Sequence, residues 1–360
     1  MTTTFNRPAQ RLASGREVPR GLWRELHRSD PYALPTQSPE WMDSLTAGSG
    51  YQDTTRLYAA PHGGAALLPM VRRTYPTGGA AIVQSMPSSW GFGGLIAPDG
   101  VTPRLVASIL DDLDRSSALR VRIRPNPLQA GAWEEATAGR AGVTAIPARA
   151  HVLDLDGGFE QVWTERMSSS TRRSVRRAEK SGVVIETDNT GRLVPVFYEL
   201  LLRSFDRWAQ QQHEPLRLAR FRGRHRDPLS KFRVIAQQMG PLCRISVAWM
   251  DGRPAAAILV LQDGVNAHYT RGAMDKELAS PVRANYLLHS TAIEEACRAG
   301  CRNYHMGESG SSQSLSRFKA NFGATPVDYA EYWIERVPFH RADRLLRGYV
   351  KRAIGFVDAQ

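Results

Sequence analysis

The chain contains 360 residues, of which 42% are hydrophobic and 23% are charged, so it is long enough for two domains that each bury a core. These proportions exclude wholesale disorder and a coiled coil. The 47 basic and 35 acidic side chains leave a formal net charge of +12, which indicates a polyanionic partner. Apolar runs do not exceed strand length, and residues 1–20 lack the apolar core of a secretory signal. We therefore expect a cytoplasmic protein without stable membrane insertion.

The first half predicts a hairpin, then a helix, then a strand. The hairpin joins residues 55–60 to 65–73 through a turn at 62–64. The helix covers 101–116 and the strand covers 119–124, each with the apolar spacing of its type. These elements are typical of an α/β unit.

The second half predicts a helix, an antiparallel meander, another helix and a final strand. Apolar side chains fall on one face of the first helix, at 193–208. Asp-Gly turns at 251–252 and 263–264 separate the strands of the meander. We expect those strands at 243–250, 253–262 and 265–272, followed by the helix at 282–299 and the strand at 301–306.

The order of hairpin, helix and strand occurs in both halves, which suggests a duplicated α/β unit. We predict a first domain at 1–150 and a second domain at 151–336. A basic helix within 337–360 has no counterpart in the first half, and we expect it to pack back on the first domain.

Basic residues concentrate in two short stretches. Residues 166–180 hold six basic side chains and one acidic side chain, and residues 203–233 hold nine and three. In the first stretch the arginines recur at i, i+1, i+4 and i+5, so on a helix they form one stripe. We interpret the second stretch as a mobile loop. Clusters of this kind are typical of proteins that bind phosphates, although a solvated surface is the simpler alternative.

Several short blocks resemble the FemABX peptidyltransferases. In the second half they are 168–182 (SSSTRRSVRRAEKSG), 268–272, 284–288, Gly307 and 317–323 (RFKANFG). In the first half, 37–45 (QSPEWMDSL) and 86–96, which contains WGFGG, are similar to the family's first domain. The resemblance implies an α/β (α+β) fold of two tandem GNAT-like domains, each a mixed, largely antiparallel sheet flanked by helices. It also implies transfer of an amino acid from aminoacyl-tRNA to an acceptor.

The resemblance places the transfer site at Phe318 and Lys319, which match the Phe-Lys pair of the family's FKxxFG block. An aminoacyl ester is already activated, so such an enzyme must mainly align the nucleophile and stabilise an oxyanion, as a fixed cation can do. A proton must also leave the attacking group. The candidate acceptors are Glu308, His305, Tyr269 and His268, and the ribose hydroxyl of the substrate is the alternative.

We expect substrate contacts from strand ends and loops in both domains. The candidates are Tyr269, His268, Arg271, Trp90 and Ser309. Residues 307–312 (GESGSS) are typical of a flexible substrate loop and do not form the GxSxG nucleophile elbow. The sequence contains no zinc motif, P-loop or dinucleotide fingerprint, so we expect no metal and no cofactor, with aminoacyl-tRNA as co-substrate.

For the tRNA backbone we expect both groups of arginines to lie together beside Phe318. The first group is Arg172, Arg173, Arg176 and Arg177, and the second is Arg220, Arg222, Arg224 and Arg226. Arginines placed in this way would track successive phosphates.

Two alternatives to aminoacyl transfer remain open. An acyl-CoA-dependent N-acyltransferase has the same fold, but residues 271–285 lack the GxG turn that would hold a pyrophosphate. A non-catalytic RNA-binding protein would also explain the basic stretches. For the transferase we expect a small-molecule or peptide amine, or a hydroxyl, as acceptor, in natural-product or cell-wall precursor biosynthesis. The sequence gives no indication of oligomeric state.

Overall fold

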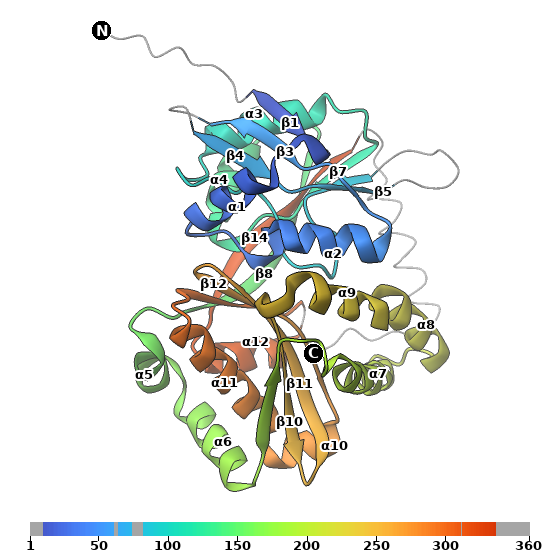
Figure 1. Cartoon of the computed structure of the whole chain (residues 1–360), viewed down its shortest axis with the longest axis vertical. Helices are drawn as coiled ribbons and strands as arrows, with labels where there is room; N and C mark the ends of the chain where they lie inside the picture. The colour runs from blue at the N-terminus through green and yellow to red at the C-terminus, as the bar shows by residue number, and fades with distance from the viewer. Residues whose placement is uncertain (1–9, 61–63, 74–81, 311, 336–360) are drawn as a thin grey trace. The chain divides into compact units, whose positions relative to one another are not determined.

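The computed structural model describes residues 10–60, 64–73, 82–310 and 312–335 (Figure 1). These residues form two compact units, one of 10–148 with 328–335 and one of 149–327. The strands β8 (Val143–Asp154) and β14 (Thr325–Glu335) cross the boundary between the units. The domain limits predicted from the sequence stay predictions, and the segment 337–360 lies outside the described residues.

The first unit contains two small sheets and four helices among its described residues. β1 (Arg11–Ser14), β3 (Arg56–Ala59) and β4 (Ala65–Leu68) form one sheet. The other has the order β2, β5, β6, β7, β14, with β6 and β7 parallel and the pairs β2–β5, β5–β6 and β7–β14 antiparallel. Its strands are β2 (Gln52–Asp53), β5 (Val71–Arg73), β6 (Ile82–Gln84) and β7 (Arg120–Ile123). The helices are α1 (Arg20–Ser29), α2 (Pro39–Ser49), α3 (Pro103–Asp114) and α4 (Ala130–Thr137).

The predicted hairpin, helix and strand of the first unit are confirmed, with one difference. The second arm of the hairpin, expected at 65–73, divides into β4 and β5 around Pro69. Proline has no N–H to donate to a ladder, so it interrupts the pairing there. The next residue, Met70, donates its N–H to the Thr55 hydroxyl, and β5 then joins the other sheet.

The second unit contains a six-stranded sheet of order β8, β13, β12, β11, β10, β9. The strands after β8 are β9 (Val184–Asp188), β10 (Cys243–Met250), β11 (Arg253–Asp263), β12 (Asn266–Met274) and β13 (Asn303–Glu308). All neighbours are antiparallel except β12 and β13, which are parallel. The meander β10–β11–β12 confirms the predicted hairpins, and Asp251 and Gly252 both have the positive φ that a two-residue turn requires.

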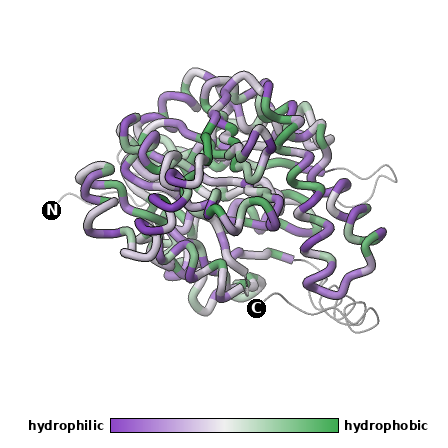
Figure 2. Tube along the Cα trace, turned by 90° about the horizontal axis from the view of Figure 1, so that it is seen from below, coloured by the Kyte–Doolittle hydropathy of each residue, from purple (hydrophilic) through white to green (hydrophobic). Residues whose placement is uncertain are grey.

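Helices cover both faces of this sheet. They are α5 (Gly158–Gln161), α6 (Ser169–Lys180), α7 (Val194–Gln211), α8 (Leu216–Arg226), α9 (Leu229–Met239), α10 (Lys276–Val282), α11 (Ala284–Arg298) and α12 (Gln313–Asn321). Figure 1 shows α11 and α6 on one face and α7 on the other. Hydrophilic and hydrophobic residues alternate along the chain in Figure 2, as amphipathic helices require. None of the described helices has the length and apolar character needed to cross a bilayer.

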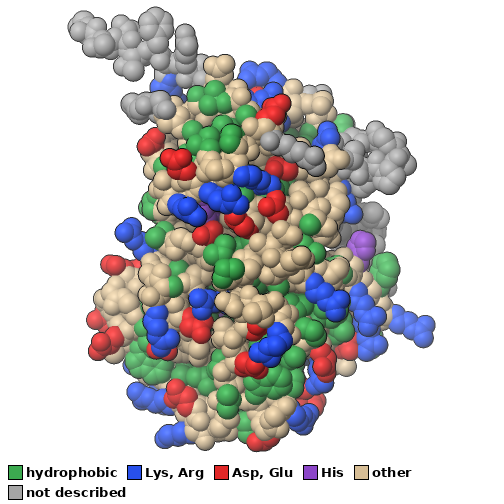
Figure 3. All heavy atoms as spheres, in the orientation of Figure 1, with side chains coloured by type: hydrophobic (Ala, Val, Ile, Leu, Met, Phe, Trp, Pro, Cys, Tyr) green, Lys and Arg blue, Asp and Glu red, His purple; other side chains and the backbone are tan. Residues whose placement is uncertain are grey.

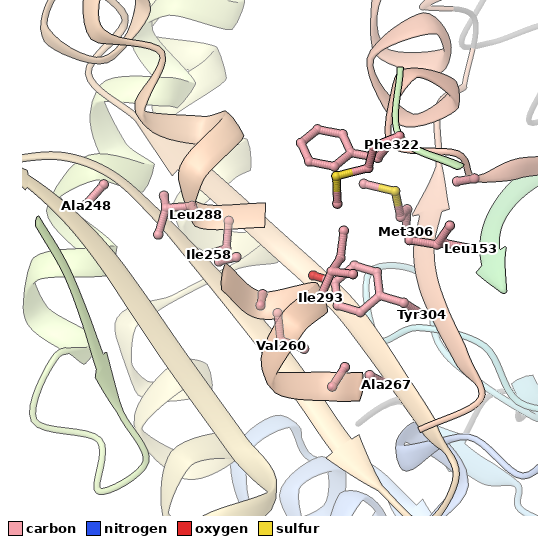
Figure 4. Close-up of a cluster of buried hydrophobic side chains, with 14 of the residues drawn as sticks. Leu153, Ala248, Ile258, Val260, Ala267, Leu288, Ile293, Tyr304, Met306 and Phe322 are labelled. Carbon is pink, nitrogen blue, oxygen red and sulfur yellow. The ribbon is translucent and has the colours of Figure 1, made fainter. Parts of the chain in front are cut away.

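The core beneath α11 fixes which side chains point to that face. Figure 4 shows Ile258, Val260 and Ala267 of the sheet meeting Leu288 and Ile293 of α11. All of these side chains are at most 4% exposed. Side chains alternate along a strand, so Leu259, between Ile258 and Val260, points to the face that α7 covers.

The mobile loop that we predicted at the second basic stretch is wrong, because this segment forms α8. Its buried residues are Ala219 and Gly223, one helical turn apart, and they face α7. A Cβ on Gly223 would approach the ring of Phe205 to 2.6 Å, so the glycine allows the two helices to pack closely. Small residues in this pattern do not produce the apolar stripe that marks a helix in a sequence.

Candidate active site

The pairing of β12 with β13 ends partway along both strands. The paired residues run from Asn266 and Asn303 to His268 and His305, although β12 continues to Met274 and β13 to Glu308. Beyond this point β13 follows β8, with Gly307 opposite His151. The ends of β12 and β13 are therefore free of each other, and functional side chains can gather there.

A bulge at Thr270 then reverses the alternation of β12. Tyr269 lies opposite Val260, whereas Arg271 lies opposite Leu259. Opposed residues of an antiparallel pair share a face, so Tyr269 points toward α11 and Arg271 points toward α7. Without the bulge, residues two apart would share one face.

Lys319 lies at the end of β13 although it belongs to α12. Its side chain is almost fully buried, at 2% exposure, and its Nζ donates to the backbone oxygens of Gly307 at 3.1 Å and Glu308 at 2.7 Å. Burial lowers the pKa of Lys319 to about 7, against the opposing effect of Glu308. An ammonium carries three donors, so the cation keeps one N–H beyond these two bonds. The arrangement can stabilise a negative charge that develops nearby.

Aromatic rings surround the neighbouring residue, Phe318. Its ring lies 5.2 Å from Tyr286, 5.4 Å from His289 and 5.1 Å from Phe322, between centroids. His289 in turn contacts Tyr269 at 4.8 Å, so the α12 block and the bulged strand meet around this histidine. Burial, and then the charge of Lys319, lower the pKa of His289 to about 3, which keeps the ring neutral.

Sequence reasoning missed a buried histidine in this region, His151 on β8. Its Nδ1 lies 3.3 Å from the Ser309 Oγ and its Nε2 lies 3.0 Å from the Ser316 Oγ. Burial lowers the pKa of His151, and the charges of Lys319 and Arg149 act in the same direction. The neutral ring can accept a proton through either hydroxyl. Only the fold brings it beside serines more than 150 positions away, so no local pattern would have found it.

The structure thus brings several predicted residues together and separates others. Lys319, Phe318, Glu308, Ser309 and Tyr269 meet at the ends of β12 and β13. His268 and His305 lie opposite each other, 6.1 Å apart between centroids, on the face away from α11. Burial lowers the pKa of His305 to about 3. The predicted roles of all these residues stay predictions.

Two predicted substrate contacts have partners elsewhere. Arg271 forms an ion pair with Asp227 on the α7 face. Trp90 belongs to the first unit, where it is buried with its ring 5.4 Å from Trp41. The substrate roles of both residues also stay predictions.

The first arginine group lies on α6, which begins directly beside α12. The Thr171 hydroxyl and the Ser168 N–H both donate to the Asn321 oxygen. Arg172 is committed to the fold, because one of its nitrogens donates to the backbone oxygens of Trp163, Thr164 and Met167. Arg176 lies 5.8 Å from the Trp163 ring, and Arg173 and Arg177 are exposed without ion pairs to other described residues.

The expectation that both arginine groups lie together beside Phe318 is wrong. The second group is on α8, which packs on α7 and therefore lies on the opposite face of the sheet from α11 and α6. Lys and Arg side chains gather over α8 in Figure 3. Three of them have acidic partners, because Arg220 pairs with Asp206, Arg222 with Glu214 and Arg226 with Asp227. Arg224 forms no ion pair with the described part of the chain.

The described residues hold no group of three or more His, Cys, Asp or Glu side chains that could bind a metal ion.

Comparisons with known proteins agree on the fold. Residues 165–320 match the family model described as "Acetyltransferase (GNAT) domain". The crystal structure of FemX is similar over 92% of this chain and 99% of its own, with a TM-score of 0.70 and 12% identity. The chain has a FemABX-like tandem GNAT fold.

Two further structures are similar at lower scores. A tandem GNAT protein from the clavulanic acid biosynthesis pathway covers 92% of this chain and 98% of its own, with a TM-score of 0.51 and 18% identity. A protein of unknown function from Bacteroides thetaiotaomicron covers 89% and 97%, with a TM-score of 0.52 and 9% identity. No curated protein matches the sequence. These likenesses confirm the predicted fold class and the resemblance to a FemABX-like tandem GNAT fold.

Proposed function

We propose that this chain is an aminoacyltransferase that moves an amino acid from aminoacyl-tRNA to the amine or hydroxyl of a small-molecule or peptide acceptor. The observation that carries the proposal is the buried Lys319, held by two backbone oxygens at the end of β13 with one donor to spare. The similarity to FemX and the GNAT-domain match support the broader class of acyl- and aminoacyltransferases. The amino acid and the acceptor belong to natural-product or cell-wall precursor biosynthesis in this proposal.

In this mechanism the activated ester needs alignment and charge stabilisation more than a strong base. The attacking group forms a bond to the carbonyl carbon of the ester, and the oxyanion of the tetrahedral intermediate accepts a hydrogen bond from the remaining N–H of Lys319. The proton of the attacking group passes through Ser309 to His151, which then protonates the ribose oxygen that leaves when the ester bond breaks, or it passes to that ribose oxygen directly. The carrier is a co-substrate, and no further cofactor takes part.

The exposed arginines of α6 supply the contacts to the carrier. Arg173 and Arg177 are free of ion pairs with described residues, and their helix begins beside Asn321, at the end of the helix α12 that carries Lys319. Such guanidinium groups release counterions when they bind phosphates. The α8 arginines are not needed for this contact, because they lie on the other face of the sheet.

Transfer is tested by incubating the full chain with bulk tRNA charged with one labelled amino acid at a time, and with a cell extract as source of acceptor. We expect RNase-sensitive transfer of label to a small molecule or peptide. Label taken instead from acetyl-CoA would favour the alternative acyltransferase, for which the GNAT-domain match is the supporting observation. RNA binding without any transfer would favour the non-catalytic alternative.

The carrier contact is tested by the double variant Arg173→Glu/Arg177→Glu. We expect weaker tRNA binding and a salt slope reduced by about 2, because about one unit of slope is lost with each phosphate contact. The matched control is Arg253→Glu/Arg302→Glu, which makes the same change in charge at exposed positions of the second unit. If both variants lose the same amount of tRNA affinity, the effect of the α6 variant is due to the change in net charge and not to a contact made by α6.

A further inference from the structure

A cavity of about 470 Å³ opens on the α7 face of the second unit, away from the candidate active site. It lies between α7, α8 and the end of β12, and its lining includes Phe205, Trp208, Glu214, Arg222, Arg226 and Arg271. Aromatic, basic and acidic side chains thus converge on one hollow. The residues that hold Lys319 do not line it.

The aromatic wall comes from one turn of α7. Phe205 and Trp208 lie 5.9 Å apart between ring centroids, at an angle of 51°. Phe205 is buried and Trp208 is partly exposed, so Trp208 offers ring surface to a ligand. Guanidinium groups flank both rings, with Arg226 5.8 Å from Phe205 and Arg207 5.7 Å from Trp208. A planar ligand ring can stack in such a setting.

The basic rim retains donors for an anion. The side chains of Arg222, Arg226 and Arg271 are 55%, 41% and 24% exposed. Each donates one hydrogen bond to a carboxylate of the described residues, whereas a guanidinium has five N–H donors in a fixed fork. Among the described residues, these three cations and Lys231 form ion pairs with two carboxylates, those of Asp227 and Glu214. The excess of positive charge favours phosphate.

The acidic wall contains an unsatisfied acceptor. The Glu214 side chain is 1% exposed, and its Oε2 accepts a hydrogen bond from Arg222 at 2.6 Å. Its Oε1 is buried without a hydrogen-bond partner among the described residues. A buried carboxylate oxygen left unpaired is costly, and a ligand N–H would satisfy it. Glu214 is among the residues that line the cavity.

We propose that this cavity binds a nucleotide. The base stacks on Trp208, an exocyclic amino group of the base donates to Glu214, and the phosphate binds the free donors of Arg222 and Arg226. Uracil has no exocyclic amino group, so adenine and cytosine nucleotides bind more tightly than uracil nucleotides. The nucleotide is either free in solution or one unit of an RNA strand, and the same chemistry recognises both.

Binding is measured by calorimetry on the full chain with AMP, CMP, UMP and ribose 5-phosphate as ligands. We expect AMP and CMP to bind more tightly than UMP, and ribose 5-phosphate to bind least. Trp208→Leu should weaken AMP binding about tenfold, since stacking contributes this much per base. Glu214→Gln should reduce the preference for AMP over UMP. Because no transfer is measured, this test is independent of the proposed reaction.

A charge control separates the site from general attraction. Arg222→Gln should weaken AMP binding severalfold, whereas Arg233→Gln, at an exposed position of α9 outside the cavity lining, should change it less than twofold. A single-stranded CCA trinucleotide distinguishes a free nucleotide from a unit of an RNA strand. If the trinucleotide binds more tightly than CMP, the cavity binds an RNA strand; if it binds equally, the cavity binds free nucleotides. The proposal is overturned if no nucleotide binds, or if Trp208→Leu and Arg222→Gln bind as the wild type does.

Discussion

Two buried lysines in an arginine-rich chain have opposite surroundings. Lys231 on α9 is 4% exposed, and its Nζ forms an ion pair with Asp227 at 2.9 Å. Lys319 on α12 is 2% exposed, but its Nζ contacts two neutral backbone oxygens and forms no ion pair with a described residue. Burial lowers the pKa of Lys231 to about 8, with Asp227 opposing the shift, and lowers the pKa of Lys319 to about 7.

The two lysines differ in whether the buried charge has an acidic partner. Asp227 also pairs with Arg226 and Arg271, so the charge of Lys231 is compensated by a buried carboxylate that it shares with two arginines. Lys319 lacks such compensation, and a buried cation of this kind destabilises the fold unless it is retained for another reason. We infer that its reason is the reaction, and each prediction below changes one member of this pair or its partner.

The largest expected effect is on the compensated cluster. Asp227→Ala should lower the free energy of unfolding by about 3–5 kcal/mol, because it leaves Lys231 buried without its counter-ion. Urea denaturation followed by circular dichroism measures the change. Glu294→Ala serves as the control, since its pair with Arg298 is exposed and should contribute less than about 1 kcal/mol. Equal losses of unfolding free energy in both variants would mean that the buried cluster around Asp227 contributes no more to stability than an exposed ion pair.

The second effect concerns turnover. Lys319→Ala should lower kcat/KM for aminoacyl transfer by about 100-fold or more, since it removes the donor for the oxyanion. Lys231→Ala should change kcat/KM only a few-fold at a temperature where both variants are folded, because Lys231 lies on the other face of the sheet with its charge bound to Asp227. An unchanged rate in Lys319→Ala would exclude Lys319 from the mechanism.

The fold was largely predictable because its signals are local. The Asp-Gly turn at Asp251 and Gly252, flanked by apolar runs, defines β10 and β11 without any tertiary information. By contrast α8 is invisible to periodicity, because its buried face consists of Ala219 and Gly223 and exists only against Phe205 of α7. A helix that is stabilised by packing on its neighbour, without an apolar stripe of its own, has a sequence typical of a polar loop.

The candidate site was predictable only where a short motif carries it. The resemblance pointed to Lys319, and the position after the predicted strand pointed to Glu308 and Ser309; these residues are close in sequence and meet in the structure. His151 joins them through β8, a contact that depends on strand order.

Charge counts were misleading for a related reason. The three acids of residues 203–233 are Asp206, Glu214 and Asp227, and each of them pairs with an arginine of α8. A count within a segment gives the net charge but does not show which groups are already paired. Nor does it show that α6 and α8 lie on opposite faces of one sheet.

The smallest expected effect is the pH dependence of stability, and it tests the comparison most directly. In the unfolded chain a lysine keeps its proton up to its ordinary pKa near 10.5, whereas the folded chain releases the proton of Lys319 above its pKa of about 7. Between these values the unfolded state binds more protons, so the contribution of Lys319 to the free energy of unfolding rises with pH. Between pH 7 and pH 9 the free energy of unfolding of the wild type should therefore rise by about 2 kcal/mol relative to that of Lys319→Met, since each pKa unit corresponds to about 1.36 kcal/mol.

The same measurement on Lys231→Met provides the contrast. The pKa of Lys231 falls only to about 8, because Asp227 favours its charged form. The free energy of unfolding of the wild type should therefore rise by about 1 kcal/mol relative to that of Lys231→Met over the same interval. Urea denaturation of the three proteins at pH 7, 8 and 9 gives both differences. If the unfolding free energies of the two variants change with pH in the same way, the two lysine charges are compensated to the same extent. The buried charge of Lys319 then no longer requires a function to explain it.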